Sequence, residues 1–243
     1  PALAITSVIP EMNPRKPAEA NAKILVDTLI NHNVTTAFCS PIIGKKISEY
    51  CNTNDIILPR IERFMLAGAP SPPSLIKELS EIISNGRVIV PYGATEALPV
   101  SFTDHRQIRE LSQSIVNGDG SCIGKPIKNI SIVLMPIRNS PLPHEYEEKI
   151  EPIVKPLQPG EICASGDTVT DGYDKMPGAT RDARFIYKSS EYHRMGDLGY
   201  WDKDGVLRFL GRKVECVQTE NGPLETERCE PMVNIIPGVK RSA

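Results

Sequence analysis

The sequence lacks the features that mark zinc-binding, nucleic-acid-binding and membrane-spanning proteins. Its six cysteines form no C-x-x-C pair and lie far from the four histidines along the chain, which argues against a zinc site. Lys and Arg total 28 against 30 Asp and Glu, so no basic excess indicates a nucleic acid or an anionic membrane as partner. No apolar run approaches the roughly 20 residues of a membrane helix. We expect reduced, mostly buried thiols in a cytoplasmic protein.

Proline, in contrast, is abundant. The chain has 22 prolines among 243 residues, about twice the usual share of roughly 5%. Because proline is excluded from helix interiors and central strands, many loops and element boundaries must follow. This composition favours a loop-rich α/β enzyme over a helical bundle, and the length fits one large domain or two small ones.

The first half of the chain alternates predicted helices and strands. Apolar residues recur at helical spacing from Ala22 to Ile30, and Ser40-Pro41 and Ser71-Pro72 are typical helix starts. The predicted strands between these helices are Thr35–Cys39, Arg63–Ala67 and Val88–Val90. Such alternation predicts a largely parallel sheet covered by helices, with ligands beyond the carboxyl ends of its strands.

The pattern changes near Gly118, and the rest of the chain is rich in predicted strands. The clearest are Ile130–Met135, Glu161–Ala164 and Val206–Leu210, with a hairpin turn at Asp202–Gly205 and no helical stripe between 130 and 210. A strand at Val214–Gln218 and a helix at about Glu225–Asn234 follow. We predict an α/β part at 1–127, a β-rich, distorted barrel-like part at 128–211, and at 212–243 the start of a second domain, too short for its own core.

One motif places polar groups at the end of a predicted strand. Tyr92-Gly93-Ala94-Thr95-Glu96 follows Val88–Val90 directly. The Thr95 hydroxyl can donate to a phosphate oxygen, Glu96 can hold Mg²⁺, and Tyr92 offers a flat face to a nucleobase. Taken alone, the motif fits an ordinary turn before a helix at least as well.

Two further motifs have the same ambiguity. Gly68-Ala69-Pro70 follows a predicted strand, and small residues there let a ligand ring lie against the backbone. Met195-Gly196-Asp197 precedes the predicted hairpin turn, and its carboxylate can accept hydrogen bonds from two neighbouring hydroxyls, as ribose presents them. Each could equally be a simple turn.

In their order along the chain, these motifs resemble those of the adenylate-forming superfamily, the AMP-dependent synthetases and ligases. The matching strings are Gly68-Ala69-Pro70, Tyr92–Glu96, Gly160-Glu161-Ile162 with Gly172-Tyr173, Gly196-Asp197 and Gly211-Arg212. Pro91–Val100 and Cys229-Glu230-Pro231 are most similar to the β-lactone synthetases of bacterial olefin synthesis, a branch often labelled fatty-acid CoA ligase. The resemblance implies part of the family's large domain followed by the beginning of its small C-terminal domain.

The resemblance also implies roles for individual residues. Gly68, Ala69 and Pro70 would line the adenine, and Tyr92, followed by Gly93, would stack on it. Thr95 would contact the α-phosphate and Glu96 the magnesium ion. Asp197 would bind the ribose hydroxyls, and Arg212 would touch ribose or phosphate.

The implied reaction is ATP-dependent activation of a carboxylic acid, a fatty or β-hydroxy fatty acid, as its acyl-adenylate. In β-lactone synthetases the substrate's own β-hydroxyl then closes a four-membered ring. In acyl-CoA ligases, the alternative, the thiol of CoA is the second nucleophile. The implied ligands are ATP or AMP, Mg²⁺ and the small-molecule acid.

The sequence departs from the family pattern at both ends. The loop that cradles the β- and γ-phosphates has no match, and neither Lys213 nor Lys240 matches the catalytic lysine. Both chain ends read as cuts through folded structure. A non-catalytic fragment that binds nucleotide weakly is therefore a further alternative. Apolar surface exposed by truncation could pair two copies in a dimer, and a partner-binding protein is a third alternative.

Overall fold

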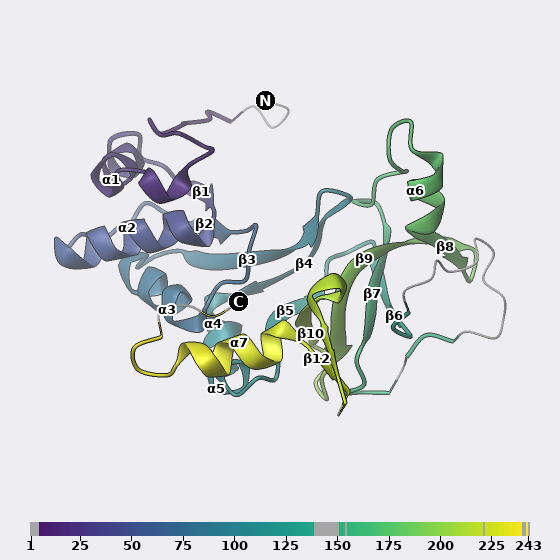
Figure 1. The fold of residues 1–243 in the computed structure, drawn as a ribbon. Coiled ribbons are helices and arrows are strands. Elements are labelled where there is room, and N and C mark those ends of the chain that lie inside the picture. Colours follow the sequence, from purple (N-terminus) through teal and green to yellow (C-terminus); the bar gives the residue numbers. More distant parts are fainter. Residues whose placement is uncertain (1–4, 139–150, 154, 221, 240–241, 243) are drawn as a thin grey trace. The chain divides into compact units, whose positions relative to one another are not determined.

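The computed structural model describes residues 5–138, 151–153, 155–220, 222–239 and 242 (Figure 1). Lys240 of the preceding section lies outside these residues. The chain divides into two compact units. The first unit comprises Pro1–Val90 and Asp104–Glu110, and the second comprises Pro91–Thr103 and Leu111–Ala243.

The first unit is a parallel sheet with helices. Its strands are β1 (Thr36–Cys39), β2 (Arg63–Leu66) and the first half of β3 (Arg87–Ala94), and its helices are η1 (Pro17–Glu19), α1 (Ala22–Asn31), α2 (Pro41–Thr53), α3 (Pro73–Ile82) and α4 (His105–Glu110). Strand β2 pairs in parallel with both β1 and β3. The parallel α/β part predicted from the sequence is confirmed.

The contact between α2 and the sheet depends on a glycine. A Cβ atom on Gly44 would lie 2.7 Å from Cδ2 of Leu66 and 3.8 Å from Phe64, both on β2. Phe64 and Leu66 are fully buried. Because a larger residue in this helix would push against them, Gly44 allows α2 to lie close to the strand.

Helix α3 begins later than predicted. Its first residue is Pro73, and Pro72 occupies the N-cap position with extended backbone (φ −64°, ψ 144°). The prediction that Ser71 caps the helix is wrong, because a residue that precedes proline is disfavoured in helical conformation and Pro72 precedes Pro73. Helix α2, in contrast, starts at Pro41 with Ser40 as its N-cap residue, as predicted.

The second unit is dominated by antiparallel strands. Its elements, besides the second half of β3, are β4 (Ala97–Asp104), α5 (Ser112–Val116), β5 (Ser121–Pro126), β6 (Ile130–Met135), β7 (Gly160–Gly166), α6 (Pro177–Asp182), β8 (Arg184–Tyr187), β9 (Ser190–Trp201), β10 (Leu207–Arg212), η2 (Lys213–Glu215), β11 (Val217–Thr219), β12 (Gly222–Leu224) and α7 (Thr226–Asn234). The main sheet has the order β4-β5-β10-β9-β7-β6, and β8 pairs with β9. The predicted β-rich second part is confirmed.

Two local predictions for this unit are wrong. Helix α6 interrupts the stretch where no helix was expected, and none of its residues is buried, so it has no apolar stripe to detect. A 3₁₀ turn at Lys213–Glu215 and a strand from Val217 replace the predicted strand Val214–Gln218. Val214 is 85% exposed, so its apolar side chain does not indicate a buried strand face.

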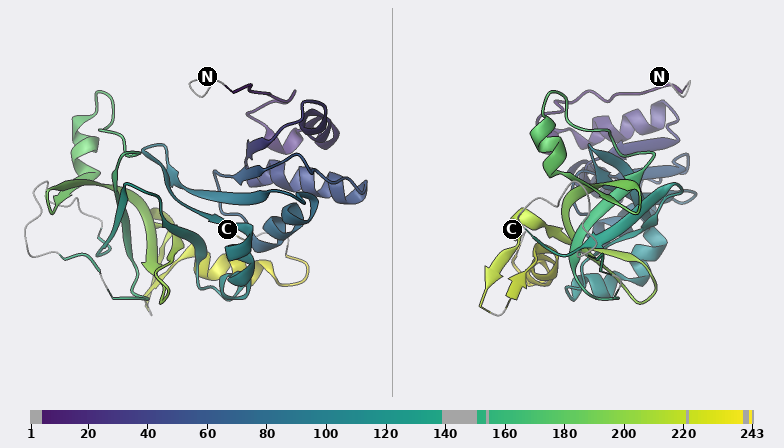
Figure 2. Two further views of the ribbon diagram at one scale, coloured as in Figure 1. Left: turned by 180° about the vertical axis from the view of Figure 1, so that it is seen from behind. Right: turned by 90° about the vertical axis from the view of Figure 1, so that its right-hand side faces the viewer.

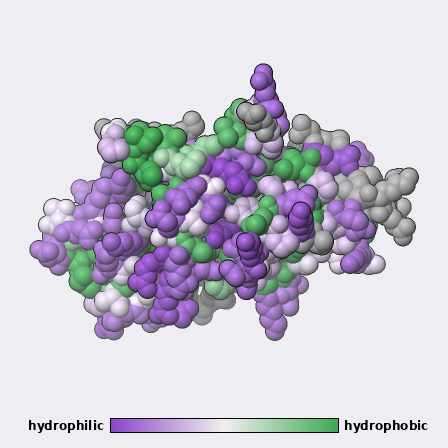
Figure 3. Space-filling model, turned by 90° about the horizontal axis from the view of Figure 1, so that it is seen from below, coloured by the Kyte–Doolittle hydropathy of each residue, from purple (hydrophilic) through white to green (hydrophobic). Residues whose placement is uncertain are grey.

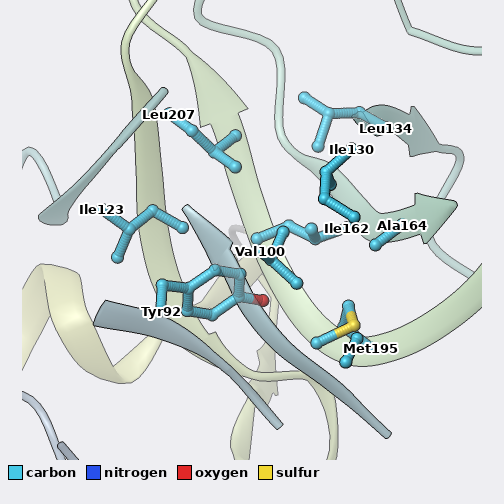
Figure 4. Packing of buried hydrophobic residues seen from close by; sticks show 10 residues of the cluster. Tyr92, Val100, Ile123, Ile130, Leu134, Ile162, Ala164, Met195 and Leu207 are labelled. Carbon is cyan, nitrogen blue, oxygen red and sulfur yellow. The ribbon is translucent and has the colours of Figure 1, made fainter. Parts of the chain in front are cut away.

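The core of the second unit gathers apolar side chains from seven strands. Figure 4 labels nine of them: Tyr92, Val100, Ile123, Ile130, Leu134, Ile162, Ala164, Met195 and Leu207. In Figure 4 the Tyr92 ring lies between Ile123 and Met195, with its hydroxyl on the side of Met195. Several residues of the sequence motifs, among them Tyr92, Ile162 and Met195, are therefore part of the core.

The last helix, α7, packs against α5 and β10, and the β11–β12 hairpin leads into it (Figure 2). A Cβ atom on Gly118 would lie 2.4 Å from the carbonyl oxygen of Arg228, and one on Gly211 would lie 2.2 Å from Oγ1 of Thr226. The Ser121 hydroxyl donates to the carboxylate of the buried Glu227. These contacts belong to one compact unit, and the domain boundary at 212 stays a prediction.

Glu227 is expected to make the stability of the second unit depend on pH. Burial raises the pKa of its carboxyl above the ordinary value of 4.5, although the hydrogen bond from Ser121 opposes this. The folded state then binds a proton more tightly than the unfolded state, so the free energy of unfolding falls as pH rises from 4.5 through the raised pKa. Glu227→Gln should flatten this dependence in urea unfolding followed by the fluorescence of Trp201, the single tryptophan. An unchanged pH slope in the variant would refute the assignment.

Within the described residues, no helix is long and apolar enough to cross a membrane. On the face drawn in Figure 3, hydrophilic residues predominate and hydrophobic residues form separate patches. Some large apolar side chains are strongly exposed, among them Ile9 at 88%. A dimer formed through such surface stays a prediction.

Candidate functional site

The turn between β3 and β4 carries two of the predicted site residues. Strand β3 continues to Ala94, four residues beyond the predicted end at Val90, and Thr95 and Glu96 form the turn before β4. Thr95 is exposed and Glu96 is half-buried. A hydroxyl and a carboxylate are thus presented side by side at the end of a strand.

Asp197 lies in a β-bulge. Strand β7 pairs Glu161 with Leu198 and Cys163 with Arg194, so three residues of β9, Met195–Asp197, stand opposite one residue of β7. Gly196 adopts a left-handed conformation there, with φ +69°, which a glycine tolerates without steric cost. Bulges of this kind redirect side chains and are frequent beside functional sites.

The carboxylate of Asp197 is buried and accepts two short hydrogen bonds. The Tyr92 hydroxyl donates to Oδ2 over 2.7 Å, and Nη1 of Arg212 donates to Oδ1 over 2.7 Å. Arg212 also donates to the carbonyl oxygen of Met195 over 3.3 Å. The Asp197 side chain is 5% exposed and that of Arg212 is 49% exposed, so Arg212 is the part of this cluster that solvent reaches most readily.

Burial and charge act in opposite directions on this cluster. Burial raises the pKa of Asp197 above 3.8, while the hydrogen bonds and charge of Tyr92 and Arg212 act to lower it. The pKa of Tyr92 lies well above 10.0, first because of burial and then because of the Asp197 charge. The Asp197 carboxylate raises the pKa of Arg212. Tyr92 and Arg212 therefore remain donors at neutral pH.

Glu96 is held by a second tyrosine. The Tyr173 hydroxyl donates to Oε1 of Glu96 over 2.8 Å, and the amide of Thr170 donates to the Glu96 carbonyl oxygen over 2.8 Å. Burial acts to raise the pKa of Glu96. The hydrogen bonds from Tyr173 and from the backbone amide of Glu96, together with the charges of His193 and Arg212, outweigh it and lower the pKa below 4.5. Glu96 is therefore ionised at neutral pH.

An ionised Glu96 fits a magnesium ion held mostly by other ligands. Among the described residues no group of three His, Cys, Asp or Glu side chains could hold a metal ion. Magnesium is commonly bound through one or two carboxylates, with water and substrate phosphates completing its coordination. A single carboxylate oriented by Tyr173 suits that mode of binding.

The structure brings several of the predicted residues together. Tyr92, Asp197 and Arg212 form one hydrogen-bonded cluster, and the charge of Arg212 also acts on the pKa of Glu96. The Tyr92 ring is 9% exposed, so its observed contact is with Asp197, and stacking on a base stays a prediction. Gly68, Ala69 and Pro70 form an exposed bend after β2 in the first unit, and their adenine role also stays a prediction.

Two further residues with defined contacts have no role predicted from the sequence. Tyr173 contacts Glu96, and Glu161 is a fully buried carboxylate paired with Arg194 and Lys213. Both lie in motif strings, Gly172-Tyr173 and Gly160-Glu161-Ile162. Their position in those strings is the one signal in the sequence that could have marked them as site residues. Their partners are 33 to 77 residues away along the chain, so the sequence does not indicate the contacts.

Gly93 is expected to be required for the β3–β4 turn. A Cβ atom there would lie 2.3 Å from the carbonyl oxygen of Ala97 and 3.2 Å from Cα of Leu98. Because both are backbone atoms, Gly93→Ala must shift the turn, and we expect a loss of about 1–3 kcal/mol in urea unfolding. Gly178→Ala is the control, because a Cβ atom on Gly178 meets nothing within 4 Å. Equal stability of the two variants would contradict the prediction.

The sequence matches known proteins over its whole length. The olefin beta-lactone synthetases of Stenotrophomonas maltophilia and Xanthomonas campestris are 34% and 35% identical over 249 aligned residues, covering 100% of this chain and 44% of each relative. The D-alanine–D-alanyl carrier protein ligase of Bacillus licheniformis is 28% identical over 87% of this chain and 39% of its own length. The chain thus spans about half the length of the curated relatives it matches.

Solved structures share the fold. An amide bond synthetase from Marinactinospora thermotolerans superposes with a TM-score of 0.74 at 19% identity, covering 93% of this chain and 41% of that one. O-succinylbenzoate coenzyme A synthetase from Bacillus subtilis, in complex with ATP and magnesium ion, gives 0.69 at 21% identity over 91% and 41% of the two chains. The family described as AMP-binding enzyme matches residues 4–174. With more than half of its residues matched, the chain belongs to the family of AMP-binding enzymes.

Proposed function

We propose that this chain carries the adenosine side of an active site that activates a carboxylic acid with ATP. In this reaction a carboxylate oxygen attacks the α-phosphorus of ATP, the bond to the β-phosphate oxygen breaks, and acyl-adenylate and pyrophosphate result. The observation that carries the proposal is the buried Asp197 carboxylate, aligned by Tyr92 and Arg212 in a β-bulge of an AMP-binding enzyme.

The proposal assigns a role to four residues. Asp197 accepts hydrogen bonds from the ribose hydroxyls, and Arg212 donates to ribose or phosphate. Thr95 donates to the α-phosphate, and Glu96 holds Mg²⁺. When bound, that ion neutralises charge on the phosphates. Positioning and charge stabilisation then supply most of the catalysis.

The product we propose is a β-lactone formed from a β-hydroxy fatty acid, in the cytoplasm. The support is the name of the two relatives matched over the whole chain, olefin beta-lactone synthetase. In the proposed reaction, the β-hydroxyl oxygen of the substrate displaces AMP and closes the ring. The alternative is a CoA thioester. Lactone formed without added thiol supports the first, and a product seen only with CoA supports the second.

A second candidate is nucleotide binding without catalysis. The observation behind it is that the chain aligns with only 44% of each relative, so the relatives' whole activity does not transfer to this chain by similarity alone. Release of pyrophosphate from ATP in the presence of fatty acids distinguishes the two candidates. Steady turnover supports the first, and AMP binding without turnover supports the second.

A calorimetric titration of the chain with AMP, with and without Mg²⁺, tests the site itself. We expect saturable binding of AMP, because its ribose and α-phosphate reach Asp197, Arg212 and Thr95. Mg²⁺ should have a small effect, because AMP lacks the β- and γ-phosphates that complete the coordination of the ion. Absence of saturable binding at millimolar AMP would overturn the proposal that this chain holds the adenosine site.

A further inference from the structure

Glu161 is a buried carboxylate that no proposed role uses. It lies on β7 with a side chain that is 1% exposed. Oε2 accepts from Nη2 and Nε of Arg194 over 2.6 and 3.2 Å, and Oε1 accepts from Nζ of Lys213 over 2.8 Å. One carboxylate is thus held by two cations from different segments.

Each of the two cations is next in sequence to a part of the Asp197 cluster. Arg194 is the last residue of β9 before the bulge Met195–Asp197. Lys213 directly follows Arg212, which pairs with Asp197 in the β9–β10 ladder. Arg194 and Lys213 also donate to the same backbone oxygen, that of Arg138, over 3.1 and 3.3 Å. The Glu161 carboxylate therefore ties the start of the bulge to the residue next to Arg212.

A comparable ion pair in the same unit has no such connection. Asp202 accepts from Nε of Arg208 over 3.1 Å, with side chains 13% and 5% exposed. Its other oxygen accepts from the amides of Asp204 and Val206. This pair fixes the β9–β10 turn and touches neither Asp197 nor Arg212 in the described structure, so it provides a matched comparison.

We propose that Glu161 is a positioning residue for ribose recognition, which holds Asp197 and Arg212 in register through Arg194 and Lys213. The inference rests on the proposed function. Two donors on one oxygen and a third on the other leave the Glu161 carboxylate little freedom to move. Its position is passed on to Asp197 through the short bulge after Arg194, and to Arg212 through the single peptide link from Lys213. At metal sites, partners that orient the metal-binding groups change affinity or activity by about 10–100-fold when they are replaced, and we expect an effect of similar size here.

The test measures how strongly the chain prefers AMP to an analogue that lacks the ribose hydroxyls, instead of AMP affinity alone. The chain is titrated with AMP and with 2′,3′-dideoxy-AMP, which lacks the hydroxyls that Asp197 would bind. The ratio of the two affinities should fall by on the order of 10-fold in Glu161→Gln. Lys213→Met, which leaves Glu161 paired with Arg194, should lower the ratio in the same direction and serves if Glu161→Gln does not fold. Asp202→Asn should leave the ratio within about twofold.

The outcomes separate this inference from the function on which it rests. A wild-type chain that binds neither nucleotide overturns the proposed function and this inference with it. A wild-type chain that discriminates, with unchanged ratios in Glu161→Gln and Lys213→Met, overturns the inference alone. A purely structural role predicts that both affinities fall together, so the ratio would stay constant. A reduced ratio in both variants, with Asp202→Asn unaffected, supports the positioning role.

Discussion

Replacing Asp197 with alanine is expected to weaken AMP binding about 10- to 150-fold. Hydrogen bonds to a charged group contribute roughly 1.5–3 kcal/mol, which corresponds to that range of affinity. The substitution removes both oxygens that would accept from the ribose hydroxyls and leaves Tyr92 and Arg212 without their shared acceptor. Calorimetric titration of the variant with AMP measures the loss directly.

Two controls make this experiment specific. Asp204→Ala removes an exposed carboxylate from the turn between β9 and β10 and should not change AMP affinity. Binding of 2′,3′-dideoxy-AMP should be much less affected by Asp197→Ala than binding of AMP. If Asp197→Ala binds AMP as tightly as the wild-type chain does, the ribose assignment is wrong.

Replacing Glu161 with alanine is expected to destabilise the second unit by about 3–5 kcal/mol. Removing one partner of a buried ion pair leaves the other charge without compensation, and the measured cost lies in this range. Here two cations lose their carboxylate partner, Arg194 with a side chain 7% exposed and Lys213 with one 17% exposed. Urea unfolding followed by Trp201 fluorescence reports on the same unit and gives the change in free energy.

The loss of stability expected for Glu161→Ala is larger than the loss expected when an exposed carboxylate is removed. Asp204→Ala in the same unit should change stability by no more than about 0.5 kcal/mol. Glu161→Gln keeps the shape of the side chain and one acceptor oxygen, so it should lose less than Glu161→Ala. A loss below about 1 kcal/mol for Glu161→Ala would mean that water reaches Arg194 and Lys213 once the carboxylate is gone.

Much of the fold follows from local patterns in the chain. The strand predicted at Ile130–Met135 has the same limits in the structure, because apolar residues alone can indicate a short buried strand. The predicted turn at Tyr92–Glu96 is confirmed only for Thr95 and Glu96, and a strand, β4, follows it in place of a helix. Strand β3 runs beyond the predicted end because Tyr92 pairs into the sheet and packs in the core, which depends on distant segments.

The connections within the candidate site could not be predicted from spacing. The Tyr92 hydroxyl meets Asp197 across 105 residues, and Tyr173 meets Glu96 across 77. Neither pairing leaves a periodic signal, because it depends on which strands become neighbours. The same is true of Glu161, whose sequence neighbours give no sign of its two cationic partners. The motif order indicated the family, and only the fold shows which residues touch.

The bulge on β9 has a consequence for the alternation of side chains along that strand. Three residues of β9 stand opposite one residue of β7, Ile162, so β9 has two extra residues at this point. Because strand side chains alternate between faces with a period of two, an even surplus leaves Arg194 and Leu198 on the faces they would occupy in an unbroken ladder. With one extra residue instead of two, every side chain beyond the bulge would point to the opposite face of the sheet. The strand can therefore hold the Asp197 carboxylate in the bulge without reversing the faces of the residues on either side of it.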